Sequence, residues 1–233
     1  MFDPRQRLIV ALDVSSAAAA QKIVAAVGDS ASCYKVGMQL YTAEGPGVVR
    51  DLVASGRRVF LDLKYHDIPN TVASAVREAA ALGVSMLTIH ASGGSKMIRA
   101  ATDAGRSAKG ALMVLGVTVL TSLDDDDLNQ LGIQGRVQDQ VLRLAKLAIA
   151  GGCHGVVASA HEASALRSEV DGDFAIVTPG VRPAGVEHGD QARVVTPAEA
   201  IAAGATHIVV GRPITGATDP AGEARAILSQ MSL

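Results

Sequence analysis

Four charged residues stand at or next to the ends of apolar segments of the sequence. Asp13 closes Leu-Ile-Val-Ala-Leu-Asp, Lys35 lies within Cys-Tyr-Lys-Val-Gly, and Asp62 and Lys64 end Val-Phe-Leu-Asp-Leu-Lys. A lone ionised group in such apolar surroundings is costly to desolvate, whereas alternating acids and lysines can neutralise one another. A structural salt-bridge network is one interpretation. The delivery of charge by three neighbouring segments favours the other, a catalytic site.

Asp62 and Lys64 are two positions apart, so on a strand they project to the same side as Phe60. We expect that side to be the interior of a barrel, with both charges at its mouth. Asp67 follows within Asp62-x-Lys64-x-x-Asp67. Because Ile-Pro-Asn-Thr71 leads into a helical segment, spacing alone also allows Asp67 to be a helix cap.

The elements that position these residues are short apolar, β-branched segments separated by alanine-rich helical ones. The apolar segments are continuous rather than alternating, which is typical of parallel strands covered on both faces. Eight strands are predicted: Leu8–Asp13, Cys33–Gly37, Arg58–Leu63, Val84–His90, Ala111–Val119, Gly155–Ser159, Phe174–Thr178 and His207–Gly211. Helices are predicted between them, including Ser15–Val27, Thr71–Leu82, Val137–Ala150, Ala160–Ser168 and Pro197–Ala203.

Eight strand-then-helix units in 233 residues predict an α/β fold, a closed (β/α)8 TIM barrel. A doubly wound sheet fits this count less well. Since no Pro-, Gly- or Ser-rich linker divides the chain, we expect one domain over residues 1–233. The long connection from Val119 to Val137 lies on the active-site face and could form a lid. Within it, Asp124–Asp127 is interpreted as the start of a short helix.

The composition of the chain limits which partners the protein can have and where in the cell it is expected. The formal net charge is −2, which makes nucleic-acid binding a poor hypothesis. The sequence begins Met-Phe-Asp-Pro-Arg, unlike a signal peptide, and no apolar run approaches the roughly 20 residues of a membrane span. We expect a cytoplasmic protein without membrane contact. Cys33 and Cys153 are predicted to be reduced core thiols.

Taken together, Asp62-x-Lys64-x-x-Asp67, Asp13 and Lys35 resemble the orotidine 5'-phosphate decarboxylase family. Four further segments resemble that family in order along the chain: Leu120-Thr121-Ser122, Pro179-Gly180-Val181-Arg182-Pro183, Gly189-Asp190-Gln191 and Val210-Gly211-Arg212-Pro213-Ile214. The resemblance covers essentially the whole chain, and no motif position departs from it.

This resemblance implies decarboxylation of orotidine 5'-phosphate to UMP, the last step of de novo pyrimidine nucleotide synthesis, with no metal or other cofactor. It makes Lys64 the group that protonates C6, within a network of Asp62, Lys35 and a second acid, Asp67. It also implies a homodimer in which Asp67 and Thr71 are contributed to the partner's site.

The substrate-binding residues implied by the family are Asp13, Lys35, Asp62, Thr71, Thr121, Ser122, Pro179, Arg182, Gln191, Gly211 and Arg212. For Arg212 there is independent support, because loops after the last two barrel strands often bind phosphate and Arg offers a forked cation. On residue type alone, Thr121 and Ser122 could equally cap the next helix. Arg182 could likewise be a solvent-facing loop residue.

Two rival functions are consistent with parts of the pattern. Sugar-phosphate enzymes of the same suprafamily, such as 3-keto-L-gulonate 6-phosphate decarboxylase and hexulose-phosphate synthase, use a similar motif with a metal, for which His66 and His90 are conceivable ligands. A catalytically silent phosphate-binding barrel is the other. A broken charge array would indicate that rival, whereas here every member of the array is present.

Overall fold

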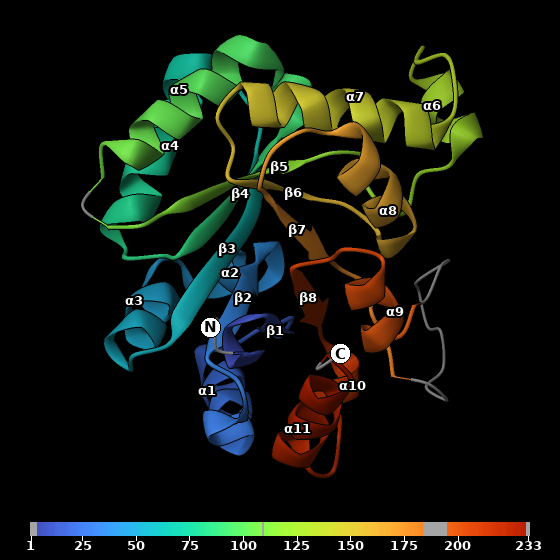
Figure 1. The fold of residues 1–233 in the computed structure, drawn as a ribbon. Helices are drawn as coiled ribbons and strands as arrows, with labels where there is room; N and C mark the ends of the chain where they lie inside the picture. Colours follow the sequence, from blue (N-terminus) through green and yellow to red (C-terminus); the bar gives the residue numbers. More distant parts are fainter. Residues whose placement is uncertain (1–3, 109, 184–194, 232–233) are drawn as a thin grey trace.

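Eight parallel strands close into a single barrel in sequence order, with β8 pairing β1 (Figure 1). The computed structural model describes residues 4–108, 110–183 and 195–231. The strands are β1 Leu8–Ala11, β2 Cys33–Gly37, β3 Arg58–Tyr65, β4 Met86–His90, β5 Met113–Val117, β6 Gly155–Val157, β7 Ala175–Thr178 and β8 His207–Val210. The predicted single-domain (β/α)8 barrel is therefore confirmed.

Helices surround the barrel and cover the outer face of the strands (Figure 1). They are α1 Ala17–Val27, α2 Met38–Glu44, α3 Gly47–Ala54, α4 Pro69–Ala81, α5 Gly94–Arg106, α6 Asp125–Gln130, α7 Val137–Ala150, α8 Ala160–Glu169, α9 Pro197–Ala202, α10 Arg212–Thr215 and α11 Pro220–Gln230. Each of the five helices predicted from sequence forms, with ends within two residues of the expected positions.

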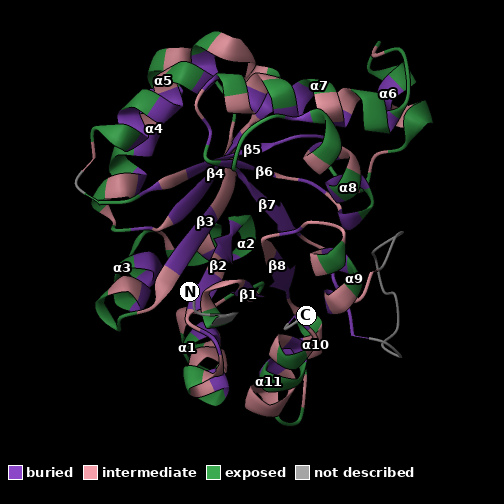
Figure 2. Cartoon of the chain, viewed as in Figure 1, coloured by how far each residue is buried: buried purple, intermediate pink, exposed green. Residues whose placement is uncertain are grey.

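Two separate apolar layers explain why the strands are apolar on both faces. Ile9, Phe60, Met86 and Leu115 belong to a cluster inside the barrel, to which other strands also contribute. A second cluster, which includes Leu8, Val10, Leu61, Leu87 and Val114, packs under the helices. Figure 2 shows the result, with buried strands at the centre and exposed residues on the outer faces of the helices. This packing fixes the rim on which polar side chains at the carboxyl ends of the strands lie.

Three expectations about strand and helix ends are corrected. β1 ends at Ala11, so Asp13 lies in the loop after the strand, and β3 extends to Tyr65, so Lys64 lies within it. Ile68 occupies the N-cap position of α4, and the Asp67 carboxylate accepts a hydrogen bond from the Ile68 N–H at 2.6 Å. Asp67 is therefore not the cap residue.

The acidic run begins a helix, as predicted. Asp124 is the N-cap of α6 and forms a reciprocal capping box with Asp127. Because Asp124 performs this role, the alternative in which Thr121 or Ser122 caps the helix is wrong.

Cys33 and Cys153 are free and buried, as predicted, and burial raises the pKa of each thiol to about 12. Among the described residues, no helix is both long and apolar enough to cross a membrane.

Candidate active site at the mouth of the barrel

A cavity of about 160 Å³ opens at the carboxyl ends of the strands. Apolar side chains from inside the barrel form part of its wall, and the charged residues of β2 and β3 form another part. Its lining residues are Lys35, Phe60, Asp62, Lys64, Val117, Val119, Leu120, Thr121, Val157, Pro179 and Val209. Asp62 and Lys64 both line it, as the sequence pattern predicted.

The charged residues form a continuous chain of alternating sign. The Lys35 ammonium lies 2.8 Å from Asp13 Oδ1 and 4.0 Å from Asp62 Oδ2, and the Lys64 ammonium lies 2.9 Å from Asp62 Oδ1. The side chains of Lys35 and Asp62 are only 12% and 14% exposed. Pairing with opposite charge offsets their desolvation, so the cavity holds ionised groups that are shielded from bulk water.

Lys64 is held by an irregular stretch of β3. The pairing of β3 with β4 shifts register between Leu61 and Tyr65, and Lys64 has φ 52°, the only positive φ of a non-glycine residue in the described ranges. Its N–H donates to Thr88 Oγ1 at 2.9 Å. The sequence alone predicts that side chains alternate regularly along this strand. In the structure, Lys64 reaches the cavity through a bulge-like irregularity in the strand instead.

Thr88 was not among the residues singled out from sequence. Its hydroxyl donates to Asp62 Oδ1 at 3.0 Å, the same oxygen that the Lys64 ammonium contacts. Thr88 is the third residue of β4 and is 1% exposed. A threonine among the apolar residues of this strand, at the same parity as the inward-facing Met86, was the available signal.

Two histidines border the lysine. The rings of His66 and His90 are 5.4 Å apart. Burial, His66 and the nearby Lys64 lower the pKa of His90, which favours a neutral imidazole. In the described ranges, no three His, Cys, Asp or Glu side chains converge as ligands for a metal ion.

Asp67 and Thr71 are exposed on the rim beside this cluster. Within the described chain, Lys64 pairs with Asp62 and not with Asp67, whose carboxylate bonds the Ile68 amide. Ile68 is itself 67% exposed. The structure of one chain therefore does not bring Asp67 to the lysine.

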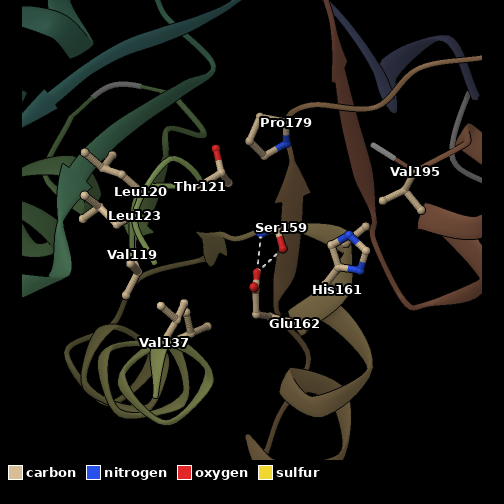
Figure 3. Close-up of a pocket in the computed structure, with 12 residues that line it drawn as sticks. Val119, Leu120, Thr121, Leu123, Val137, Ser159, His161, Glu162, Pro179 and Val195 are labelled. Carbon is tan, nitrogen blue, oxygen red and sulfur yellow. Dashed lines mark hydrogen bonds between the residues drawn. The ribbon is translucent and has the colours of Figure 1, made fainter. Parts of the chain in front are cut away.

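The loops after β5 and β7 meet on another side of the mouth. Thr121 and Pro179 line both the main cavity and an adjoining hollow of about 20 Å³ (Figure 3). In that hollow the Glu162 carboxylate turns back onto Ser159, accepting hydrogen bonds from its N–H and hydroxyl. Ser159, the N-cap of α8, and Glu162 thus form a capping box, while Ser122 lies exposed next to Thr121.

The structure brings Arg182 and Arg212 to one region after β7 and β8. Arg182 is only 7% exposed, because Val181 bridges to Val195 and the Arg182 N–H donates to the Val195 carbonyl at 3.0 Å. The interpretation as a solvent-facing residue is therefore wrong. Burial, and then the positive charge of Arg212, lower the pKa of Arg182.

Two neighbouring arginines, close enough for the charge of Arg212 to act on Arg182, make this region suited to an anion. Gly211 is the N-cap of α10, immediately before Arg212. Gln191 lies outside the described residues.

Comparison with known proteins gives a consistent result. The model of the "Orotidine 5'-phosphate decarboxylase / HUMPS family" matches residues 6–227. An orotidine 5'-phosphate decarboxylase from Anaeromyxobacter dehalogenans is 52% identical over 224 residues, covering 96% of this chain and 97% of that protein. One from Moorella thermoacetica is 49% identical over 235 residues, covering 98% and 93%.

Among solved structures, orotidine 5'-phosphate decarboxylase from Lactobacillus acidophilus aligns with a TM-score of 0.88 at 40% identity, covering 98% of this chain and 100% of that one. The chain therefore belongs to the orotidine 5'-phosphate decarboxylase / HUMPS family.

Proposed function

We propose that this protein decarboxylates orotidine 5'-phosphate to UMP, the last step of de novo pyrimidine nucleotide synthesis, without a cofactor. The observation that carries this proposal is the Lys64 ammonium, held 2.9 Å from Asp62 in the cavity at the barrel mouth. Relatives with about half of their residues in common carry the corresponding name.

Lys64 supplies the central chemistry. When the bond between C6 and the carboxylate breaks, its electron pair stays on C6 and CO2 leaves. The Lys64 ammonium stabilises the developing negative charge and then donates a proton to C6. Because Asp62 fixes the ammonium before substrate arrives, little reorganisation is needed during the reaction.

The neighbouring charges have supporting roles. Asp62 lies close to the leaving carboxylate and disfavours the bound ground state, although preorganised charge around Lys64 carries more of the effect. Lys35 completes the charge network, and Asp13 and Lys35 hold ribose hydroxyl groups. The exposure of the Asp13 side chain, 55%, leaves it accessible to a ligand.

The rest of the nucleotide lies across the mouth. Thr121, Ser122 and Pro179 contact the pyrimidine, with Ser122 hydrogen-bonding its edge. Arg212, Arg182, Gln191 and the backbone at Gly211 hold the phosphate. The burial of Arg182 near a second guanidinium supports this assignment, since a bound dianion offsets the repulsion between two cations.

The active form in this proposal is a homodimer with shared sites. Asp67 and Thr71 reach the partner's cavity, where Asp67 supplies the second carboxylate beside Lys64. The exposure of Asp67 on the rim, with a large apolar side chain at Ile68 next to it, supports an intersubunit role.

One experiment tests both the reaction and the sharing of sites. The fall in orotidine 5'-phosphate absorbance is followed with wild type, Lys64→Ala, Asp67→Asn, and the two variants co-expressed in equal amounts. We expect wild-type turnover and a loss of at least about 10³-fold in each single variant. Co-expression should restore about a quarter of wild-type activity, because half of randomly paired dimers have one intact site in two.

Each arm can fail separately. Absence of wild-type turnover would overturn the proposed reaction. Substantial activity in Lys64→Ala would show that another group protonates C6, and no recovery on co-expression would overturn the shared site alone. Activity lost on exhaustive chelation and restored by a divalent cation would favour the metal-dependent branch of the family, for which His66 and His90 are the conceivable ligands.

A further inference from the structure

Thr88 occupies a junction of the charge network that the proposed mechanism does not use. A threonine hydroxyl has one proton to donate and lone pairs to accept with. Here the proton goes to Asp62 Oδ1 at 3.0 Å, and the oxygen accepts the Lys64 N–H at 2.9 Å. The Thr88 side chain therefore fixes both the Asp62 carboxylate and the backbone of Lys64, the residue with which Asp62 forms an ion pair.

The backbone bond matters because of where Lys64 lies. The register shift takes the Lys64 N–H out of the ordinary strand pairing, and an unpaired buried N–H is costly. The left-handed φ of 52° is a strained conformation for a residue with a Cβ. The Thr88 hydroxyl accepts the hydrogen bond of this N–H and so stabilises the strained backbone conformation of Lys64.

The carboxylate bond matters for a different reason. Asp62 Oδ1 contacts both the Thr88 hydroxyl and the Lys64 ammonium, whereas Asp62 Oδ2 faces Lys35 at 4.0 Å. Rotation of the carboxylate would disturb both ion pairs at once. Since Thr88 is 1% exposed, water does not readily replace its hydroxyl.

We propose that Thr88 is a positioning residue, whose single hydroxyl holds the strained Lys64 backbone and the Asp62 carboxylate in the geometry required for protonation at C6. This inference rests on the proposed function for its catalytic consequence. Thr88 acts through Lys64 and Asp62 and not on the substrate itself. Its effect should therefore fall on kcat and leave nucleotide binding nearly unchanged.

The test compares Thr88→Val, which keeps the shape and removes the hydroxyl, with Thr88→Ser, which keeps the hydroxyl. We expect Thr88→Val to lower kcat by about 10- to 100-fold, with KM and the Kd for UMP within about twofold of wild type. Thr88→Ser should retain most of kcat. Thr102→Val is the matched control, because Thr102 is another buried threonine, on α5, with its hydroxyl bonded to the Gly151 carbonyl at 2.9 Å.

A second measurement does not depend on turnover. Amide hydrogen exchange at Lys64, followed by NMR, should be at least about 10-fold faster in Thr88→Val than in wild type or Thr88→Ser, because the acceptor is lost. The amides of Phe60 and Leu61, outside the bulge, should keep their protection. If wild type does not turn over orotidine 5'-phosphate, the proposed function fails while this measurement still reports on Thr88.

The proposal is overturned by any of three results: wild-type kcat in Thr88→Val, an equal loss in Thr88→Ser and Thr88→Val, or unchanged exchange at Lys64. A comparable loss of kcat per folded molecule in Thr102→Val would also overturn it, since the effect would then be general to buried threonines.

Discussion

Positively charged side chains have different partners at the two ends of the barrel. At the mouth, the cations of Lys35 and Lys64 lie against carboxylates. At the floor, the end at which the strands begin, two arginines bond neutral oxygens instead: Arg58 donates to the Gln6 side chain at 2.7 Å, and Arg7 donates to the Thr206 carbonyl at 2.8 Å. The network around Lys64 balances its charges in ion pairs, whereas these two arginines at the floor bond neutral groups.

His207, at the first position of β8, shows the consequence at the floor. Burial, with the positive charges of Arg58 and Arg7, lowers the pKa of His207 to about 4. This histidine is therefore neutral at pH 7, so the floor avoids an additional charge by releasing a proton. The comparison predicts that substitutions at the mouth change catalysis, and those at the floor or along the barrel wall change stability.

Beyond the Lys64 and Asp67 variants, the largest effect is expected at the phosphate side of the mouth. Arg212→Ala should lower kcat/KM for orotidine 5'-phosphate by about 10²- to 10³-fold, because a charge-assisted grip on the phosphate is lost. The free energy of unfolding should change by less than about 1 kcal/mol, since Arg212 is exposed. Steady-state kinetics and urea unfolding measure the two quantities.

Orotidine, which lacks the phosphate, sharpens this test. Arg212→Ala should barely alter its slow turnover, so that the variant prefers the nucleotide over the nucleoside by a smaller factor than wild type does. Arg225→Ala, at an exposed arginine of α11, is the control. Wild-type kcat/KM in Arg212→Ala would contradict the assignment.

The next largest effect, on stability, is expected for a substitution in the barrel wall, where strands β6 and β7 pair. A Cβ at Gly155 would lie 2.3 Å from the Ala175 carbonyl oxygen on the neighbouring strand, so the backbone of one strand must move. Gly155→Ala should lower the free energy of unfolding by about 1–3 kcal/mol. KM should be unchanged where the variant is folded.

Gly47→Ala, at the first position of α3, is the control for this substitution. Apart from its two chain neighbours and the backbone of its own helix, no atom of the described chain lies within 4 Å of a Cβ at Gly47. Urea unfolding of the two variants measures the difference, and equal stabilities would show that the strands accommodate the added methyl group.

The floor predicts a pH dependence. The pKa of His207 falls from 6.5 to about 4 on folding, so the unfolded chain binds more protons between these values. The free energy of unfolding therefore rises with pH across this window and falls on acidification, by about 3 kcal/mol from this group. His207→Asn should flatten the urea-unfolding profile between pH 4 and 6.5 by that amount. Parallel profiles would contradict the prediction.

The fold and the charged residues of β2 and β3 could be predicted from the sequence, because the signals for them lie in short stretches of the chain. Continuous apolar segments indicate burial on both faces, and a charge that follows such a segment is expected near the carboxyl end of the strand. Asp62 and Lys64 do lie in the last half of β3. No pairing between distant residues had to be known.

The rest depended on contacts between distant residues. The bulge at Lys64 and its bond to Thr88 arise from the register between two strands. The burial of Arg182 depends on a bridge from Val181 to Val195. On residue type alone, Arg182 was interpreted as solvent-facing, because nothing local to it indicates burial.

Gly37 lies in a strand that the sequence predicts, but its neighbours depend on the pairing of two strands. Its substitution gives the smallest expected effect on kcat. It pairs with Asp62 across β2 and β3, and a Cβ there would lie 2.9 Å from the Lys35 ammonium nitrogen and 3.4 Å from Asp13 Oδ1. The end of a lysine side chain can move at little cost, so Gly37→Ala should fold with nearly wild-type stability. Its kcat should fall by about 10-fold, because the displaced ammonium weakens the charge network.

A double-mutant cycle with Lys35→Ala isolates the cause. If displacement of the ammonium is responsible, Gly37→Ala should have almost no further effect on kcat once Lys35 is alanine. Additive losses would place the effect in the strand backbone instead. The mouth would then resemble the wall at Gly155, where packing and not charge sets the cost of a methyl group.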